Sequence, residues 1–282
     1  MLNNKKVLIS GGTGSLGNAL VGKICTDYKP EKLIIFSRDE YKQKIMAEKF
    51  DYYPCLRFFL GDIRDIKRFK EVCRDVDIVI HAAALKQIPT LEYNPTEAIK
   101  TNVDGTVNVV EACIDCGVDK AILISTDKAV NPVNLYGATK LCAEKIFLAA
   151  NSFNKTRFSV VRYGNVLNSR GSVIEHFLKL KEAGIKEFPI THPDMSRFWL
   201  TLEDAARFVL VSLITANDKV AIPQIPSMRM VDVARAIDPE CTFKITGIRP
   251  GEKLHESLTE GYTSDKNDQW LTPEELRRKI GL

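Results

Sequence analysis

The stretch VLISGGTGSLG, residues 7–17, joins a short apolar strand to a glycine-rich loop that opens a helix. Glycines let the chain turn tightly and let its backbone approach a pyrophosphate, whose negative charge is stabilised at a helix N-terminus. A glycine-rich loop alone is weak evidence. Here it follows a strand and precedes a helix, which is the order that dinucleotide binding requires.

Outward from this stretch, short apolar strands alternate with segments of helical periodicity. Near-continuous apolarity is typical of strands covered on both faces of a parallel sheet. Such strands are predicted at 7–9, 33–36, 58–60, 78–80, 122–124 and 158–161, and helices at 39–50, 96–116 and 135–150. The repeat predicts an α/β fold, a doubly wound parallel sheet of the Rossmann type.

The regular alternation of strands and helices ends at about residue 165, and beyond it prolines separate shorter elements. Helices are predicted at 202–214, 230–237 and 273–280, the last with Thr272 and Glu275 as a capping box. We expect residues 1–165 to form the dinucleotide-binding domain, with part of the later chain returning to it. Residues 166–282 are expected to form mainly a smaller mixed substrate-binding lobe.

The end of the second predicted strand carries Ser37-Arg38-Asp39, about twenty residues after the glycine-rich loop. A carboxylate directly at that position favours NAD, whereas the cationic fork of Arg38 suits a 2′-phosphate and favours NADP. Lys42 adds a second positive charge. A solvated surface arginine remains the alternative. Asp62 and Ile63 at the third strand end are expected beside the adenine, and Ala82 begins a run of small residues along the cofactor's path.

Tyr136 and Lys140 are four residues apart on a predicted helix, so their side chains share one face. A nearby ammonium and a positively charged nicotinamide favour the phenolate, which predicts a lowered pKa for Tyr136. Such a tyrosine removes a proton from a sugar hydroxyl while hydride leaves the same carbon. An ordinary helix with these residues is the alternative reading.

Asp127 and Lys128 distinguish this chain within that chemistry. Oxidation at a sugar C4 acidifies the proton on C5, so a second base and an acid can expel water from C6. We predict that Lys128, desolvated beside Lys140, becomes partly neutral and serves as the base. Buried Asp127 is predicted to hold a proton for the leaving hydroxyl. The alternative is a polar turn with a structural aspartate.

Composition excludes several other classes of protein. The net charge of +4 is small and dispersed, which argues against a nucleic-acid partner. No apolar run approaches the length of a membrane helix, so we expect no membrane partner and a cytoplasmic location. The seven cysteines are scattered and are read as reduced packing residues. His81 is read as a packed core residue, and no histidine has metal-type spacing, so no metal is expected.

These residues carry a resemblance to the extended short-chain dehydrogenase/reductase family, and within it to the soluble inverting UDP-N-acetylglucosamine 4,6-dehydratases of bacterial pseudaminic acid synthesis. The motifs that carry it begin at Gly11, Ser37, His81, Ser125, Asn134, Arg162 and Gly247. The resemblance implies hydride transfer from C4 to NADP, loss of water across C5 and C6, and hydride return to C6 with inversion at C5. The implied product is UDP-2-acetamido-2,6-dideoxy-β-L-arabino-hex-4-ulose, made by Asp127, Lys128 and Tyr136.

The resemblance also implies binding residues and an assembly. The cofactor would contact Gly11, Thr13, Gly14, Ser15, Leu16, Ser37, Arg38, Asp39, Glu40, Lys42, Asp62, Ile63, Ala82, Tyr136, Lys140, Val166, Leu167, Asn168, Ser169 and Arg170. The substrate, UDP-N-acetylglucosamine, would contact Lys86, Ser125, Thr126, Asn165, Val173, Thr191, Arg249 and Glu252. For Arg249 a salt bridge within the small lobe is the alternative. A homo-oligomer, a hexamer, is implied through the helices at 96–116 and 135–150.

Three positions depart from the pattern of the resemblance. Gln87 stands where histidine is expected, Asn168 stands where glycine is expected, and the chain after Glu256 is shorter than usual. Release of a 5,6-ene intermediate and retention at C5 therefore stay open. So do a nucleotide-sugar 4-epimerase or reductase and an NADP-sensing regulatory protein without turnover.

Overall fold

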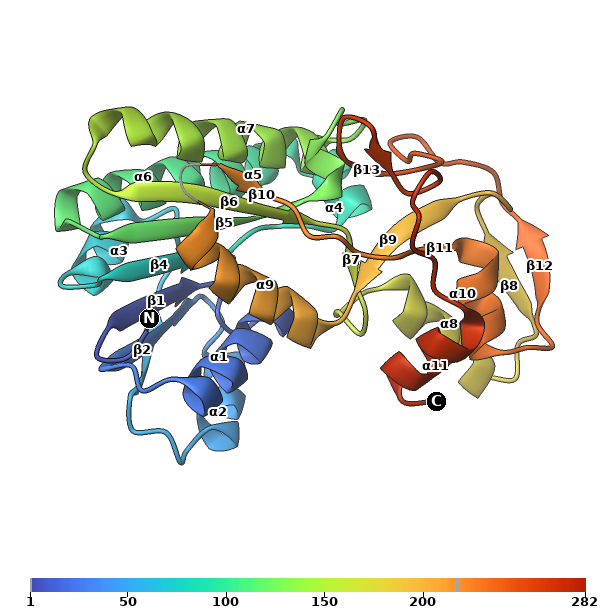
Figure 1. Ribbon diagram of the computed structural model, residues 1–282, viewed down its shortest axis with the longest axis horizontal. Helices are drawn as coiled ribbons and strands as arrows, with labels where there is room; N and C mark the ends of the chain where they lie inside the picture. The colour runs from blue at the N-terminus through green and yellow to red at the C-terminus, as the bar shows by residue number, and fades with distance from the viewer. Residues whose placement is uncertain (1, 217–218) are drawn as a thin grey trace.

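The computed structural model describes residues 2–216 and 219–282. Its main sheet has seven parallel strands in the order β10-β6-β5-β4-β1-β2-β3 (Figure 1). They are β1 (Lys6–Ser10), β2 (Lys32–Ser37), β3 (Leu56–Leu60), β4 (Ile78–His81), β5 (Lys120–Thr126), β6 (Arg157–Tyr163) and β10 (Val220–Ala221). Strand order reverses between β1 and β4, where doubly wound sheets bind ligands at the carboxyl ends of their strands. The predicted Rossmann-type sheet is confirmed.

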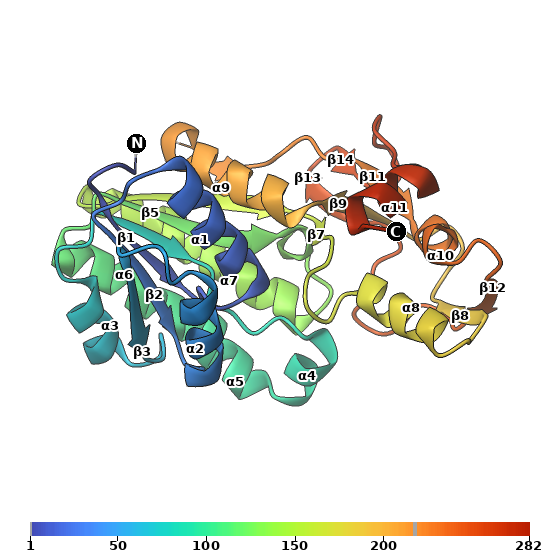
Figure 2. The ribbon, with the colours of Figure 1, turned by 90° about the horizontal axis from the view of Figure 1, so that it is seen from below.

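Helices cover both faces of this sheet, and each face has its own apolar core (Figures 1 and 2). One face carries α1 (Ser15–Asp27), α2 (Glu40–Lys49) and α9 (Leu202–Thr215). The other carries α3 (Ile66–Cys73), α6 (Gly105–Cys116) and α7 (Leu135–Ala149). Burial on both faces explains why these strands are almost continuously apolar in the sequence.

The helix predicted at 96–116 contains one turn of a different kind. It runs as α5 (Pro95–Ile99), a π-helical turn (Lys100–Asp104) and α6. Within the π-helical turn, Asn102 exchanges two hydrogen bonds with the backbone of Leu85, at 2.8 and 2.9 Å. Such turns occur often at functional sites. This one fastens the loop between β4 and α4 (Ile88–Tyr93), which lines the cavity described below.

The second lobe packs around a mixed three-stranded sheet, in which β9 (Ser196–Leu200) pairs parallel with β7 (Asn165–Val166) and antiparallel with β11 (Ser227–Arg229). Its other elements are α8 (Val173–Glu182), β8 (Glu187–Ile190), α10 (Met230–Ile237), β12 (Thr242–Ile245), β13 (Ser257–Thr259), β14 (Tyr262–Thr263) and α11 (Pro273–Ile280). A separate apolar core fills it. The smaller mixed lobe and the capping box of α11 are therefore confirmed.

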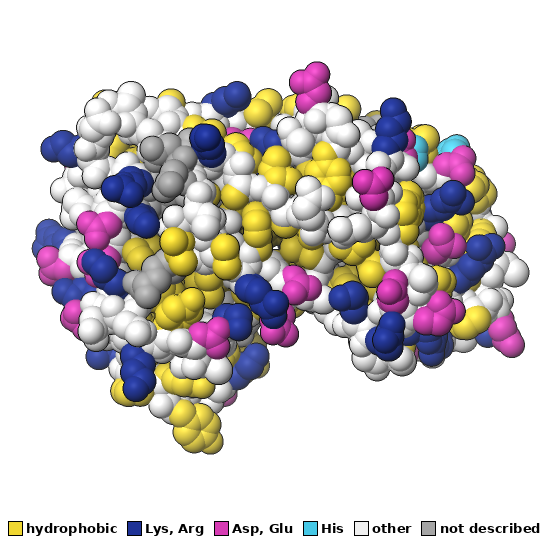
Figure 3. Space-filling model, in the orientation of Figure 1, with side chains coloured by type: hydrophobic (Ala, Val, Ile, Leu, Met, Phe, Trp, Pro, Cys, Tyr) yellow, Lys and Arg dark blue, Asp and Glu magenta, His cyan; other side chains and the backbone are white. Residues whose placement is uncertain are grey.

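The chain crosses between the two parts more than once. After β9 it returns to the main sheet as α9 and β10, and then re-enters the second lobe at β11 (Figure 1). The division at residue 165 stays a prediction. The surface is hollowed between the part that carries α1 and α2 and the second lobe (Figure 3). Among the described residues, the helices are all too short or too polar to cross a bilayer.

Candidate active site

A cavity of about 630 Å³ lies at the carboxyl ends of the main strands, between them and the start of the second lobe. Most of the predicted site residues line it. They are Gly11, Thr13, Gly14, Ser15, Leu16, Ser37, Arg38, Asp39, Lys42, Asp62, Ile63, Ala82, Lys86, Ser125, Thr126, Lys128, Tyr136, Lys140, Asn165, Val166, Ser169, Arg170 and Val173. The cavity therefore joins segments that the sequence separates widely.

The dinucleotide end of the cavity is built around the N-terminus of α1. Gly14 is the N-cap residue there and has no side chain that could cap the helix, so the first amides of α1 are available to an anion. The loop after β7 reaches this end, where the Arg170 N–H donates to Ser15 Oγ at 3.3 Å. The glycine-rich loop is thus bordered by the second lobe.

Charged side chains follow β2 on the same edge. Asp39 caps α2 by accepting from the Lys42 N–H, and the Lys42 ammonium pairs with the Asp39 carboxylate. The second positive charge predicted at Lys42 is therefore already paired with a carboxylate. Arg38 Nη1 lies 3.4 Å from Asp62 Oδ2, and the Arg38 side chain is 51% exposed. Arg64 holds Asp62 from the other side at 2.7 Å, so Arg38 is the less constrained of the two arginines.

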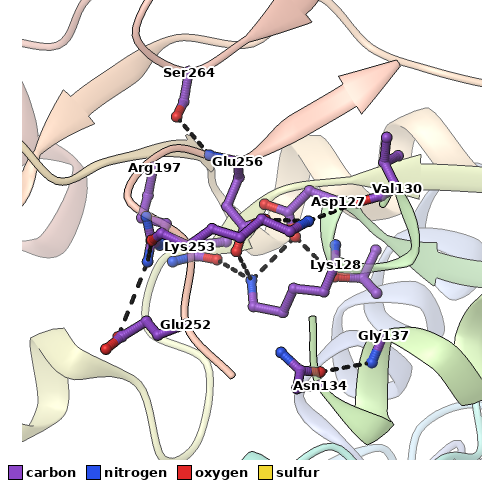
Figure 4. Close-up of polar contacts among 12 residues, drawn as sticks. Asp127, Lys128, Val130, Asn134, Gly137, Arg197, Glu252, Lys253, Glu256 and Ser264 are labelled. Atoms are coloured by element: carbon purple, nitrogen blue, oxygen red, sulfur yellow. Dashed lines mark hydrogen bonds and ion pairs between the residues drawn. The ribbon is translucent and has the colours of Figure 1, made fainter. Parts of the chain in front are cut away.

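The acid–base end begins where β5 ends. Asp127–Ala129 form one 3₁₀ turn directly after β5, and α7 packs against that turn. Asn134 caps α7 by accepting from the Gly137 N–H at 2.8 Å (Figure 4). A Cβ on Gly137 would lie 2.2 Å from the Lys128 carbonyl oxygen. Glycine at this position therefore permits the close approach that brings α7, which carries Tyr136 and Lys140, to the turn.

Asp127 and Lys128 form a buried ion pair. Lys128 Nζ lies 3.1 Å from Asp127 Oδ1 and 3.1 Å from Asn165 Oδ1. Asp127 is fully buried and lies beneath the cavity lining, and its Oδ1 also accepts from Thr126 Oγ1 at 2.9 Å. Its Oδ2 has no hydrogen-bond partner among the described residues. Burial without a partner disfavours a negative charge on that oxygen.

Lys128 differs from the prediction. Burial works to lower its pKa, but attraction to Asp127 and to Glu256, whose Oε1 is 3.7 Å away, outweighs burial and raises it. The predicted partly neutral Lys128 is therefore wrong for this arrangement, because carboxylates surround its ammonium. For Asp127, burial and repulsion from Glu256 raise the pKa against the attraction of Lys128. That direction agrees with the predicted protonated Asp127.

Tyr136 and Lys140 both lie in the cavity wall, on the face of α7 that was predicted. Burial raises the pKa of Tyr136 to about 12, so the predicted lowering is not found. The pKa of Lys140 falls instead, to about 8, because burial outweighs the attraction of Glu144. Burial therefore moves the two pKa values apart, and it makes Lys140 the group of the two that changes protonation near neutral pH.

A second buried ion pair stands behind this wall. Arg162 donates through Nε to Glu144 Oε1 at 3.0 Å and through Nη1 to the Leu258 carbonyl at 2.8 Å. The Ser125 hydroxyl donates to the same Glu144 oxygen at 2.5 Å. This pair links α7 to β6 and to the second lobe, and it occupies the Ser125 hydroxyl that was predicted to contact substrate.

Seven predicted site residues do not line the cavity: Asp127, which lies beneath the lining, and Glu40, Leu167, Asn168, Thr191, Arg249 and Glu252. The Arg249 side chain is 70% exposed and pairs with Glu252 at 3.1 Å, as the salt-bridge alternative anticipated. Asn168 adopts φ 57°, a left-handed conformation that asparagine tolerates. Gln87 lines the cavity, and its amide lies close to Gly171. The contacts assigned to all predicted site residues stay predictions.

His81 is confirmed as a hydrogen-bonded core residue. Its Nδ1 lies 2.7 Å from Ser10 Oγ and its Nε2 lies 3.2 Å from Thr106 Oγ1. Burial, helped by Lys140, lowers its pKa to about 3.

Sequence reasoning missed the residues that the second lobe contributes to the acid–base end. Glu256 is the main one, with Lys253 and Arg197 beside it (Figure 4). Glu256 follows the glycine-rich motif that begins at Gly247, but no spacing in the sequence connects it with Lys128. Only the return of the chain from the second lobe brings them together.

The comparisons with known proteins agree with this geometry. Residues 7–273 match the model of the family described as "Polysaccharide biosynthesis protein". The chain is 54% identical over 262 residues to a Campylobacter jejuni protein named UDP-N-acetylglucosamine 4,6-dehydratase (inverting), covering 92% of this chain and 78% of the relative. It is 41% identical over 271 residues to a Rickettsia canadensis protein named UDP-glucose 4-epimerase, covering 92% and 78%.

Among solved structures, Pen from Bacillus thuringiensis superposes with a TM-score of 0.92 at 32% identity, covering 99% of this chain and 98% of that one. The resemblance to extended short-chain dehydrogenases/reductases is thereby confirmed. The chain belongs to the polysaccharide biosynthesis protein family, a group of extended short-chain dehydrogenases/reductases.

Proposed function

We propose that this protein is an NADP-dependent UDP-N-acetylglucosamine 4,6-dehydratase that inverts C5. The observation that carries the proposal is the buried Asp127–Lys128 pair at the same cavity as Tyr136 and Lys140. Hydride transfer alone needs a tyrosine and a lysine, whereas loss of water needs a further base and acid. The Campylobacter relative, which carries that activity in its name, supports the proposal.

In the first step Tyr136 gives its phenol proton to the neutral amine of Lys140, and the resulting phenolate accepts the proton of the C4 hydroxyl. Its neighbour Lys140, with a pKa of about 8, gains or loses a proton near neutral pH and supplies the route by which the phenol is reset. The glycine-rich loop at the start of α1 and Arg38 would hold a nicotinamide dinucleotide, which would supply the oxidant for C4 and the hydride for C6. Lys140 is buried and Tyr136 is half-buried in the cavity wall, which limits the access of water to a sugar bound there.

In the second step the pair works through one shared proton. Transfer of that proton along the 3.1 Å contact from Lys128 Nζ to Asp127 Oδ1 gives a neutral amine and a neutral carboxylic acid. The amine takes the C5 proton, the C5=C6 bond forms, the C6–O bond breaks, and Asp127 protonates the departing hydroxyl to water. Inversion then requires that C5 take a proton from solvent on the face opposite Lys128 while C6 regains the hydride, which would give the inverted 4-keto-6-deoxy sugar.

The NADP preference rests on Arg38. Its guanidinium is half exposed at the end of β2 and has one carboxylate neighbour, Asp62, at 3.4 Å. A 2′-phosphate offers it a stronger, doubly hydrogen-bonded partner. The two-part domain division, the substrate contacts, the homo-hexamer through α6 and α7 and the cytoplasmic location are proposed with the function and stay predictions.

The proposal is tested by proton NMR of a mixture of purified protein, NADP and UDP-N-acetylglucosamine. A 6-methyl doublet is expected, together with loss of the C6 hydroxymethyl signals. In deuterated water, deuterium enters C5 and the methyl doublet collapses, while the couplings among H1, H2 and H3 report the ring conformation that the C5 configuration imposes. A product that keeps the original C5 configuration contradicts the inverting assignment, and an unchanged sugar contradicts the dehydratase.

The second candidate function is a nucleotide-sugar 4-epimerase, which the name of the Rickettsia relative favours. An epimerase uses the same loop, tyrosine and lysine but keeps the C6 oxygen. The same NMR experiment separates the two, because an epimerase yields a new C4 epimer and no methyl signal. A protein that only senses NADP gives neither.

A further inference from the structure

Glu256 reaches the Asp127–Lys128 pair from the second lobe. It lies directly before β13, is 3% exposed, and places Oε1 3.7 Å from Lys128 Nζ (Figure 4). Its backbone N–H donates to Ser264 Oγ at 3.0 Å. Ser264 Oγ in turn lies 2.8 Å from Ser196 Oγ on β9. A buried serine pair therefore fixes the backbone from which the carboxylate extends.

Lys253 ties the same segment to the catalytic turn. Its Nζ lies 3.3 Å from Glu256 Oε2 and donates to the Val130 carbonyl, just after the turn, at 2.6 Å. Glu256 and the turn are thus held together on two sides, through Lys128 and through Lys253. Any displacement of this segment moves Glu256 relative to Lys128.

The charges around the two carboxylates differ. The titratable groups that face this cluster are Lys128, Lys253, Arg197, Lys86, Tyr136, Asp127 and Glu252. Glu256 faces three cations, Lys128, Arg197 and Lys253, which outweigh its burial and lower its pKa. Among the described residues, Lys128 is the one cation in contact with Asp127. Glu256 is therefore the anion of the cluster, and Asp127 is the carboxyl that retains a proton more readily.

We propose that Glu256 is a positioning residue for the dehydration step: it fixes Lys128 Nζ between Asp127 and Asn165 and sets the pH range over which the Asp127–Lys128 pair holds one shared proton. This inference rests on the proposed function. Glu256 acts through Lys128 and takes no proton from the sugar.

The sign of the effect follows from electrostatics. A fixed negative charge makes it harder for either member of the pair to lose a proton, so it raises both apparent pKa values of the pair. The pair is active when it holds one proton. As pH increases, the rate of water loss therefore rises around the lower apparent pKa of the pair and falls around the higher one. Without the charge, both limbs of the pH profile move to lower pH, by about 1–3 units for a charge at this range.

The test compares Glu256→Gln with Glu260→Gln, because Glu260 is an exposed residue of the neighbouring turn between β13 and β14. Single turnovers are followed across pH by cofactor absorbance for C4 oxidation and by quenching and NMR for water loss. In Glu256→Gln we expect cofactor reduction within about 3-fold of wild type and both limbs of the water-loss profile at lower pH. The Glu260→Gln profile should overlay wild type. Unshifted limbs in Glu256→Gln overturn the inference, even if the rate falls uniformly.

Glu256→Asp guards against a variant that merely misfolds. It keeps the charge but withdraws it by one methylene, so we expect a slower water loss with limbs close to wild type. If the pH profile of water loss in Glu256→Asp were shifted as far as that of Glu256→Gln, a charge effect would be contradicted. A measurement that needs no turnover separates this inference from the proposed function. It is an NMR titration of the Lys128 ¹³Cε signal, which the variant Lys128→Arg assigns. In Glu256→Gln this signal should titrate at lower pH than in wild type. Titration at an unchanged pH overturns the inference, whereas a wild type that makes no deoxy sugar overturns the function.

Discussion

The two ends of the cavity are assembled in different ways. At the dinucleotide end, neighbours in sequence are neighbours in space: the glycine-rich loop opens α1, and Asp39 caps α2 and pairs with Lys42 one turn later. Its charges are exposed to solvent. At the acid–base end, Asp127 and Lys128 meet Glu256 from the second lobe, and all three are largely buried. The dinucleotide end therefore depends on contacts between residues close in sequence. The acid–base end depends on charged residues that are far apart in sequence and are buried together.

This difference predicts that single charges matter far more for folding at the acid–base end. Arg162→Met keeps an apolar stem but leaves the buried Glu144 carboxylate without its partner. Breaking a buried pair in this way costs about 3–5 kcal/mol of the free energy of unfolding. Urea unfolding measures it. Arg207→Met is the control, because Arg207 pairs with Glu203 on the surface and should change stability by less than about 1 kcal/mol. Equal losses in the two variants would remove the distinction.

Lys140 should make the free energy of unfolding depend on pH. Its pKa is about 8 in the folded chain, below its ordinary value of 10.5, so the unfolded chain binds more protons there between those values. Stability therefore rises with pH across this window, and below about pH 8 the buried lysine costs roughly 3 kcal/mol. Lys140→Met should be more stable than wild type by that amount at pH 7, with the gain shrinking toward pH 10.5. Denaturation curves at several pH values check this.

The control for that experiment is Lys145→Met on the same helix, since Lys145 is exposed. Its unfolding free energy should run parallel to wild type across the pH range. A gain in Lys140→Met that does not change between pH 7 and 10.5 would argue against a lowered pKa.

At the dinucleotide end, removal of a charge should affect binding and leave folding intact. Arg38→Ala is expected to weaken NADP binding by about 10- to 100-fold, the worth of a charge-assisted hydrogen bond, and to leave NAD binding and the unfolding free energy nearly unchanged. Fluorescence titration with both cofactors measures this. Lys44→Ala is the matched control on α2, as Lys44 is exposed. Equal loss of NAD and NADP affinity would mean that Arg38 does not read the 2′-phosphate.

The smallest expected change in stability comes from substituting a glycine of α1. A Cβ on Gly17 would lie 2.0 Å from the Gly12 carbonyl oxygen, whereas a Cβ on Gly22 would meet only the Phe50 ring at 3.8 Å. Gly22→Ala should therefore stabilise the protein by about 0.5–1 kcal/mol through helix propensity. Gly17→Ala should lose both stability and dinucleotide binding. Thermal unfolding of the two variants compares them, and a stabilising Gly17→Ala would contradict the close packing of loop and helix.

The sequence predicted well what depends on nearby residues. The Rossmann-type sheet, the helix that carries Tyr136 and Lys140 and the capping box of α11 follow from periodicity and turn chemistry, which act over a few residues. The π-helical turn at Lys100–Asp104 was not foreseen, because helical periodicity does not resolve one inserted residue.

The errors concern charge states, which depend on what burial brings together. Lys128 was expected beside Lys140, but its near neighbours are the carboxylates of Asp127 and Glu256. For Tyr136 the cost of burial outweighs the attraction of Lys128 and raises the pKa. Neither outcome has a signature in sequence spacing, since Glu256 arrives from the second lobe.

Lys128→Ala in a single turnover tests the central claim most directly, with cofactor absorbance and 6-deoxy product measured on the same sample. If the Asp127–Lys128 pair performs only the loss of water, the bound cofactor should become reduced at close to the wild-type rate while water loss falls by about 10²–10⁴-fold. A variant that still forms the 4-keto-6-deoxy sugar at the wild-type rate would contradict it.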